Sequence, residues 1–379
     1  MNSNWVCWNG KGKPIMSHGP VLEVYLDHLV DNFNFVKNMA GAGVRTGAVV
    51  KSDAYGLGLT SVAHALYKSG CELFFVASLD EALKLRQSGI LASIVVFDAD
   101  IKRASGEFQR QKLVAVVNDR DDLKSIASAA GSMPYYLNIE TGFSRFGLDV
   151  ESVTSIERDG GFRHAWPVCL FTHLACSDNP QDGTNALQRE KLLTASRAFP
   201  RVPLSLTASA GLWLDPSYHM DIARIGSALY GLNNARIYPN PLTPVVKLKA
   251  PVIDVHHVPV QQSVGYGGTF RTRRSSTLGV LPIGYKHGLP WACANRISVR
   301  LGSFIVPVVG RIAMEYTTID LTDVPDAAKG RGRIVEFLFD EFGVDELASA
   351  AGANGQEILT RLGAGCPRNH IATALRSTG

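Results

Sequence analysis

Short apolar runs alternate with amphipathic stretches between residue 21 and about residue 235, and this alternation constrains the fold more than any other feature of the chain. Each apolar run is long enough for a strand that is buried on both faces. The runs that predict strands are 21–25, 46–50, 74–77, 93–97, 113–117, 135–139, 168–171 and 203–206. The stretches with apolar residues near helical spacing are 26–39, 61–67, 79–87, 121–130 and 185–198.

Roughly eight strand-then-helix units in succession predict an α/β fold with parallel strands. A closed (β/α)8 TIM-type barrel and an open doubly wound sheet both fit this count. No G-x-G-x-x-G follows the first strand, which weakens the dinucleotide-binding form of the open sheet.

The texture of the chain changes after about residue 240. Pro239, Pro241 and Pro244 indicate a linker, and the residues beyond it form short Val/Ile/Leu runs separated by Gly and Pro. This pattern predicts a mostly β C-terminal domain, with two short helices at 344–351 and 355–362. We therefore expect two domains, residues 20–238 and 245–379, and assign no role to residues 1–19.

Composition excludes several classes of protein. Apolar residues make up 46% of the chain and the net charge is +4, which is typical of a globular protein and too weak for a nucleic-acid partner. No apolar run reaches the roughly 18–20 residues of a membrane helix, and the first twenty residues have no apolar signal core. The six cysteines form no C-x-x-C pair, so we expect free thiols, no metal site and a cytoplasmic location.

Lys51 ends an apolar run and precedes a loop that contains Gly56 and Gly58. In a β/α barrel, the residues at the carboxyl end of a strand face the active site. Partial desolvation there lowers the pKa of a lysine, so that its amine can form a Schiff base. The alternative is an ordinary surface lysine at the end of a strand.

With this segment in view, the chain resembles the alanine racemase family of pyridoxal phosphate (PLP) enzymes. Residues 49–58 match the family pattern V-V-K-x-x-A-Y-G-x-G at every fixed position. Further matches follow in the family's order, and together they cover most of residues 20–375. They are residues 139–147, 172–175, 208–210, 224–231, 264–267, 284–285 and 309–314.

The resemblance implies a two-base racemisation of L- and D-alanine. Lys51 resembles the lysine that holds PLP and acts on one face of the substrate, and Tyr266 resembles the acid/base on the other face. A phenol is a poor base at neutral pH unless nearby cations stabilise the phenolate, and His173 and Arg224 are the candidates for that. Arg224 also resembles the arginine that donates to the pyridine nitrogen. A guanidinium is permanently protonated, so it cannot accept a proton from a pyridinium.

The resemblance also implies binding residues and a partner. Tyr55, Ser209 and the backbone N–H groups of Gly226 and Ser227 are expected to bind the cofactor's phosphate. The substrate carboxylate is expected at Arg145 and the backbone N–H of Met314, near Tyr285. In the family, the tyrosine of the β domain reaches the other subunit, so Tyr266, Tyr285 and Met314 are expected to act in trans to Lys51 within an obligate homodimer.

Some positions depart from the family pattern. Asn138 stands where a lysine is usual, Glu315 where an aspartate is usual, and Gln356 where a gating tyrosine is usual; Lys286 and His287 replace Ala-Asp. We expect these changes to leave the proton chemistry intact and the substrate open, so that serine or another polar or larger amino acid is a candidate.

Other functions stay open at this point. The same scaffold supports retro-aldol cleavage or decarboxylation, although Arg224 disfavours the decarboxylase. A PLP carrier without catalysis is disfavoured because this chain has a β domain with its tyrosine in place. A phosphate-sugar barrel enzyme is supported only by Lys51 and the phosphate-binding glycines.

Overall fold

The computed structural model describes residues 7–8, 14–15, 19–128, 133–158, 160 and 166–372. The N-terminal extension to which we assign no role lies outside the described residues, except for Gly19 and two short paired strands, β1 (Cys7–Trp8) and β2 (Pro14–Ile15). Two compact units are present. One comprises residues 28–54 and 59–243, and the other comprises residues 1–27, 55–58 and 244–379.

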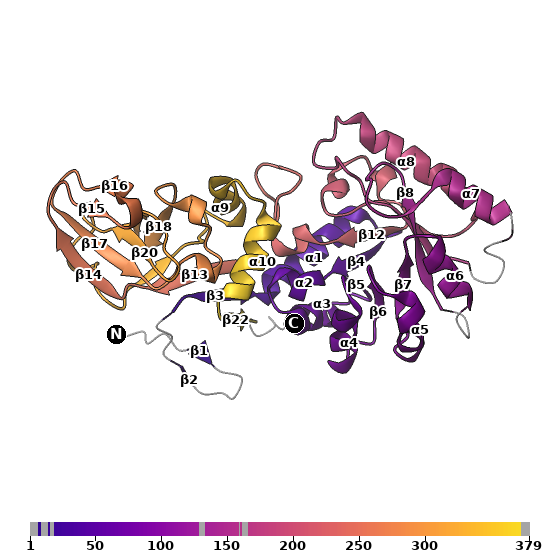
Figure 1. Cartoon of the computed structure of the whole chain (residues 1–379), viewed down its shortest axis with the longest axis horizontal. Helices are drawn as coiled ribbons and strands as arrows, with labels where there is room; N and C mark the ends of the chain where they lie inside the picture. The colour runs from indigo at the N-terminus through magenta and orange to yellow at the C-terminus, as the bar shows by residue number, and fades with distance from the viewer. Residues whose placement is uncertain are drawn as a thin grey trace, which may run out of the picture. The chain divides into compact units, whose positions relative to one another are not determined.

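The first unit is a barrel of eight parallel strands surrounded by helices (Figure 1). Backbone hydrogen bonds from Asp221 to Leu204 (3.1 Å) and from Arg224 to Thr207 (3.0 Å) join the last two strands. The barrel is therefore nearly closed, which confirms the barrel and excludes the open sheet. Its strands are β4 (Arg45–Val49), β5 (Leu73–Val76), β6 (Ser93–Val96), β7 (Val114–Val117), β8 (Tyr135–Glu140), β10 (Cys169–Phe171), β11 (Leu204–Ser205) and β12 (Ile222–Ile225).

Five helices of the first unit, α1, α3, α4, α6 and α8, lie close to the predicted ranges. Leu29, Phe33, Val36 and Ala40 of the first helix are buried on one face, at the spacing of an amphipathic helix. The helices are α1 (Leu26–Ala40), α3 (Leu59–Lys68), α4 (Leu79–Gln87), α5 (Ile101–Arg110), α6 (Arg120–Ser128), α7 (Val150–Arg158) and α8 (Gly183–Ser196). The end of the predicted helix 121–130 lies outside the described residues.

Sequence patterns missed three elements of the barrel. Helix α5 is mostly polar and buries only Ile101 and Phe108, two turns apart on one face, so it has too few apolar residues to stand out in the sequence. Helix α7 buries only Val153 and Ile156. Strand β12 is interrupted by Arg224, and a charged residue in a four-residue strand hides the apolar run.

One predicted strand belongs to a different sheet. Residues 21–25 were expected to open the barrel, but β3 (Val21–Tyr25) pairs with β13 (Val246–Pro251) and β22 (Arg368–Ile371) in the second unit. The apolar run predicted the strand correctly. Its partners lie more than 200 residues away, and local sequence does not record them.

The second unit is rich in strands, as predicted (Figure 1). A six-stranded sheet has the order β19-β18-β21-β13-β3-β22, a three-stranded sheet has the order β14-β17-β20, and β15 pairs with β16. Helices α9 (Val344–Ala351) and α10 (Gly355–Gly365) confirm the two short helices. The strands not yet bounded are β14 (Asp254–Val258), β15 (Ser263–Val264), β16 (Phe270–Arg271), β17 (Ser276–Leu281), β18 (Ser298–Leu301), β19 (Phe304–Pro307), β20 (Thr317–Asp320) and β21 (Ile334–Glu336).

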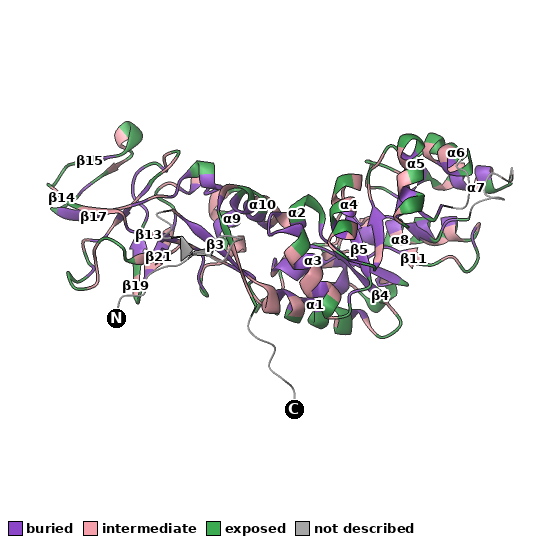
Figure 2. Ribbon diagram, turned by 90° about the horizontal axis from the view of Figure 1, so that it is seen from below, coloured by how far each residue is buried: buried purple, intermediate pink, exposed green. Residues whose placement is uncertain are grey.

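Alternating charges cross four neighbouring strands of the six-stranded sheet. Arg300 on β18 pairs with Glu336 on β21 (2.6 Å), and Lys249 on β13 lies 3.7 Å from Glu336 and 2.9 Å from Glu23 on β3. The Tyr25 hydroxyl also donates to Glu23 (2.8 Å). Figure 2 shows buried positions in the region of β13, β21 and β3. The Glu23 side chain is itself buried. We call Arg300, Glu336, Lys249 and Glu23 the charge ladder.

Candidate active site

Lys51 directly follows β4, at the carboxyl end of a barrel strand, as the sequence predicts. Its ammonium nitrogen lies 6.0 Å from the centre of the Phe97 ring. Burial by the surrounding rim, followed by the charge of Arg145, lowers the pKa of the Lys51 amine from its usual value. A lysine of this kind is a better nucleophile and base at neutral pH than a free one.

Arg224 lies on β12, where it pairs in register with Gly47 on β4. Its guanidinium is buried and donates to the Thr172 carbonyl (2.6 Å) and to the Ser205 hydroxyl (2.5 Å). None of the ion pairs among the described residues involves Arg224, so its charge faces no carboxylate. Burial lowers its pKa to about 10, which leaves the guanidinium protonated at neutral pH.

His173 follows β10 and lies next to Arg224, with 3.4 Å between its Nδ1 and the Nη2 of the arginine. Burial lowers the pKa of His173 to about 3, and the charges of Arg224, Arg145 and Lys51 act in the same direction. The structure thus brings these four predicted residues together. His173 is neutral at pH 7, so of the two predicted cations only Arg224 carries charge.

Aromatic rings from four strands line the barrel beneath these cations. Phe75 stacks on Phe97 (5.5 Å between centroids), and Tyr136 and Phe171 complete the cluster at 6.1 Å from each other. The guanidinium of Arg224 lies 5.1 Å from the Phe171 ring. Lys51 and Arg224 thus contact the faces of aromatic rings, which attract a cation without neutralising its charge. We did not single out these rings from the sequence, although Phe97 and Phe171 lie at strand ends.

Three of the residues predicted to bind phosphate, Ser209, Gly226 and Ser227, lie around a short turn after β12. The Ser209 hydroxyl accepts hydrogen bonds from the backbone N–H groups of Gly226 (3.0 Å) and Ala228 (3.1 Å). Ser227 is buried at the start of the same turn. Tyr55 belongs to the other compact unit, and burial raises its pKa to about 12, so its hydroxyl keeps its proton.

Arg145 lies in a loop after β8 and stacks on Phe143, 4.4 Å from the ring centroid. The carboxylate of Glu140, at the start of this loop, accepts from the backbone N–H groups of Gly142 and Ser144, and so shapes the loop. Asn138 donates to the side chain of Asn118 (2.8 Å) and brings no charge.

Tyr266, Tyr285 and Met314 lie in the second unit and are exposed, Tyr266 by 71%. The Tyr285 N–H donates to the Ala313 carbonyl (3.0 Å), which joins the two loops that carry Tyr285 and Met314. Trp291 and Tyr316 are also exposed. We call Tyr266, Tyr285, Trp291, Met314 and Tyr316 the aromatic surface.

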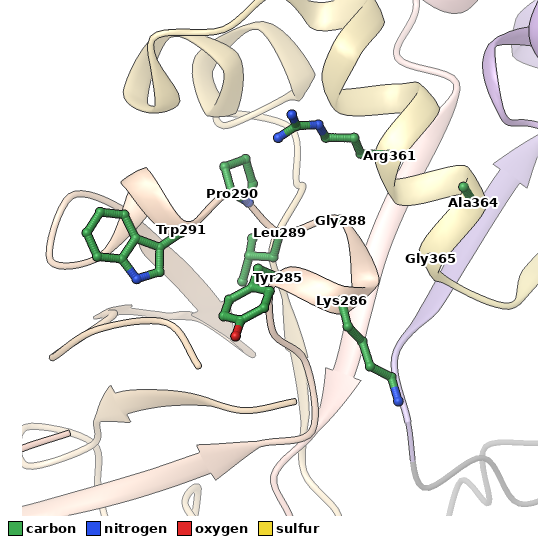
Figure 3. Close-up of a pocket in the computed structure, with 9 residues that line it drawn as sticks. All are labelled: Tyr285, Lys286, Gly288, Leu289, Pro290, Trp291, Arg361, Ala364 and Gly365. Carbon is green, nitrogen blue, oxygen red and sulfur yellow. The ribbon is translucent and has the colours of Figure 1, made fainter. Parts of the chain in front are cut away.

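A pocket of about 780 Å³ opens beside this surface. Figure 3 shows Tyr285 and Lys286 on one short turn, Trp291 beyond them, and Arg361 reaching in from α10. All of its lining residues belong to the second unit, so this pocket contains none of the barrel residues described above.

Apart from Asn138, the residues that depart from the family pattern lie in the second unit and have partners there. Lys286 and Glu315 form an ion pair (2.8 Å). His287 is buried, and its Nδ1 accepts from the Gly284 N–H (3.1 Å), which stabilises the turn that carries Tyr285. Gln356 lies in the first turn of α10, where its carbonyl accepts from the Thr360 hydroxyl (2.7 Å).

The fold and site define a class of protein: a barrel enzyme with a lysine of lowered pKa at the end of one strand and a buried arginine on the neighbouring strand. Models of the alanine racemase N-terminal and C-terminal domains match residues 24–234 and 245–370. The chain belongs to the alanine racemase family. Within the described residues, no cluster of His, Cys, Asp or Glu could hold a metal ion, and no helix is long and apolar enough to cross a membrane.

Similar proteins support this assignment along nearly the whole chain. Alanine racemase 3 of Mesorhizobium japonicum is 49% identical over 95% of this chain and 92% of its own length. The biosynthetic alanine racemase of the same organism is 47% identical over 93% and 88%. The crystal structure of alanine racemase from Bartonella henselae with covalently bound pyridoxal phosphate has a TM-score of 0.87 at 28% identity, over 94% of this chain and 100% of that one.

Proposed function

We propose that this protein is a PLP-dependent racemase that interconverts L- and D-alanine. One observation carries the proposal: the guanidinium of Arg224 is buried and charged, faces no described carboxylate, and lies on the strand that pairs with the one leading to Lys51. Burying a cation without a paired anion lowers the stability of the fold, so such a group indicates a site where a ligand or a reaction needs the charge. Family membership and the curated relatives support the same conclusion.

The residues present fit PLP. Arg224 offers a donor to a pyridine nitrogen without giving up its own proton. Lys51 offers an amine of lowered pKa to the aldehyde. Ser209 and the N–H groups of Gly226 and Ser227 are proposed to hold the phosphate, together with the Tyr55 hydroxyl. When bound, PLP supplies an electron sink for the bond that breaks at the substrate's Cα.

Two acid/base groups divide the proton transfers between the faces of the substrate. Lys51 removes or returns the Cα proton on one face, and Tyr266 does so on the other. One base alone would return the proton to the side that it left. His173, held neutral, accepts from Arg224 through Nδ1 and is proposed to pass that polarisation to the phenol of Tyr266.

The substrate's carboxylate is proposed to bind Arg145 and the backbone N–H of Met314, beside Tyr285. Arg145 stacks on Phe143 and forms none of the ion pairs recorded for the described chain, so its charge is available to an anion. We expect a small amino acid to be the preferred substrate. Lys286 and Glu315, which form an ion pair, both depart from the family pattern. A broader range of substrates, including serine, is therefore the alternative to test.

We further propose that the active enzyme is a homodimer with shared sites. The aromatic surface supports this, because its five large side chains are exposed in a single chain and a dimer interface would bury them. A second copy, contributing Lys51 and Arg145, is the proposed occupant. On dilution, activity should fall together with the mass of the dimer. An active monomer would refute the arrangement.

The domain boundaries at 20–238 and 245–379 are likewise proposed, and limited proteolysis should cut first near the prolines between them. We also propose a cytoplasmic location. The described cysteines are free thiols, as expected in a reducing compartment: Cys71, Cys169, Cys176, Cys293 and Cys366. Cell fractionation tests this location.

A single experiment tests the function. The purified protein, loaded with PLP, is incubated in deuterated water with a panel of L-amino acids. Chiral analysis should report D-alanine, and mass analysis should report one deuterium at Cα with no loss of carbon dioxide. Cleavage or decarboxylation products without inversion would overturn the proposal. Faster turnover of serine than of alanine would replace the substrate and keep the chemistry.

A further inference from the structure

Four consecutive residues after Lys51 adopt left-handed backbone conformation. Ser52, Asp53, Ala54 and Tyr55 have φ values of 57°, 55°, 54° and 56°, and none of them is glycine. Each L-residue in this region costs roughly 1–2 kcal/mol. A strained run of this kind persists only where neighbouring groups hold it, and it is typical of functional sites.

The carboxylate of Glu81 holds this turn. Its Oε1 accepts from the Asp53 N–H (2.9 Å), in the centre of the strained run. Its Oε2 accepts from the Ala77 N–H (2.9 Å), directly after β5. One side chain thus ties the turn that follows Lys51 to the end of the neighbouring barrel strand.

Glu81 is itself fixed in place. It lies in the first turn of α4, where its N–H donates to the hydroxyl of the N-cap residue Ser78 (3.4 Å). Asp53 is held from its other side, because its Oδ1 accepts from the Leu59 N–H (2.8 Å). The turn is therefore held at Asp53 on two sides, by the Glu81 carboxylate through the backbone N–H and by the start of α3 through the Asp53 side chain.

We propose that Glu81 is a positioning residue: its carboxylate holds the left-handed turn and thereby sets where the Lys51 amine stands. The proposal rests on the proposed function, in which Lys51 carries the cofactor. Glu81 acts through the backbone. Its charge also opposes the effects of burial and of Arg145 on Lys51, since it is the anion recorded as acting on that amine within the described chain.

A topologically equivalent carboxylate serves as a control. Asp122, in the first turn of α6, accepts from the Asn118 N–H (2.9 Å) directly after β7, just as Glu81 accepts from Ala77 after β5. Asp122 has no recorded bond to the left-handed turn. Both carboxylates fix the end of a strand, but among the described contacts Glu81 is the one that also binds the left-handed turn through the Asp53 N–H. Comparing variants of the two residues therefore isolates the effect of that contact.

The test follows cofactor loading. Full-length apoprotein is mixed with pyridoxal phosphate, and the visible absorption of the lysine-bound cofactor is recorded against pH, with hydride trapping to locate it on Lys51. The loading rate rises with pH to a plateau as the amine loses its proton. In Glu81→Gln we expect the plateau to fall by about tenfold to a hundredfold, as for a displaced reacting group, and the midpoint to move to lower pH.

Two further variants keep the result decisive. Glu81→Asp retains the charge but is one methylene shorter, so its plateau should fall with the midpoint unchanged; it also replaces Glu81→Gln if that variant does not fold. Adding Ser52→Gly to Glu81→Gln should restore much of the plateau, because glycine adopts φ 57° without strain. Asp122→Asn should match the wild type in both quantities.

The outcomes separate the two proposals. If the wild type forms no lysine-bound cofactor, the proposed function fails. If the wild type loads normally and Glu81→Gln stays within twofold of its plateau, the inference about Glu81 is wrong. Equal losses in Glu81→Gln and Asp122→Asn would also overturn it, because the strand end would then be what matters.

Discussion

The Nη2 atom of Arg224 lies 3.4 Å from the Nδ1 atom of His173, and neither residue takes part in an ion pair within the described chain. A neutral imidazole thus stands beside a buried guanidinium. The site keeps an uncompensated positive charge, which suits an anionic cofactor and substrate and lowers the stability of the empty fold.

Arg224→Met should therefore stabilise the cofactor-free protein while it weakens cofactor binding. Removing an uncompensated buried charge should raise the free energy of unfolding by about 1–2 kcal/mol, even though three donated hydrogen bonds are lost. Urea unfolding of the apoprotein measures this change. Arg300→Met is the matched control, because Arg300 pairs with Glu336 and its loss should destabilise. Destabilisation of the same size in both variants would contradict the prediction.

Acid should destabilise the protein partly through His173. Because its pKa is about 3 in the folded state against 6.5 as the usual value, the unfolded chain binds more protons between these pH values. Stability is then fully present above pH 6.5 and is lost as pH falls toward 3. Between pH 7 and pH 4, the free energy of unfolding should fall by about 2–3 kcal/mol more in the wild type than in His173→Gln. Parallel pH profiles of the two proteins would show that His173 is not held neutral.

The charge ladder should matter to stability where an exposed ion pair does not. Lys249→Met removes the cation of the charge ladder that pairs with the buried Glu23 carboxylate and leaves the contact of Glu23 with the Tyr25 hydroxyl, so it should cost about 2–4 kcal/mol. Adding Glu23→Gln should recover part of that loss, because the unpaired charge is removed. Lys124→Met, which breaks an exposed pair with Asp121, should cost less than about 0.5 kcal/mol. Chemical unfolding of the four proteins tests this, and no recovery in the double variant would argue against charge as the cause.

Two helical glycines should respond in opposite ways to alanine. A Cβ at Gly363 in α10 would lie 2.0 Å from the Gly56 carbonyl oxygen, so Gly363→Ala must displace backbone and should destabilise by more than about 2 kcal/mol. At Gly106 in α5 a Cβ meets only the end of the Arg110 side chain at 3.4 Å. Gly106→Ala should therefore stabilise by up to about 1 kcal/mol, the helix propensity of alanine over glycine.

Thermal unfolding of both glycine variants, monitored by circular dichroism, tests these two stability predictions. A Gly363→Ala protein that melts at or above the wild-type temperature would mean that α10 does not pack as closely on residues 55–58 as the structure indicates. The Gly106→Ala variant confirms that the assay detects a stabilising substitution.

Local patterns in the sequence were enough for much of this protein. Apolar runs predicted most strands of the barrel and of the β domain, because a buried strand needs consecutive apolar residues whatever its partners are. The motif around Lys51 predicted a lysine at a strand end, and the structure has Lys51 at that position; its reactivity stays a prediction. Family membership follows from motifs spread along the chain, since these report residue identity and order.

Packing between distant segments decided the rest. The run 21–25 joins the second unit because its hydrogen-bonding partners lie at 246–249 and 368–371. His173 is neutral because burial and three cations from separate elements act on it. Glu81 reaches the turn after Lys51 across 28 residues of chain. Hydrogen-bond partners and pKa values depend on which groups come within a few ångströms, and only the folded chain determines those distances.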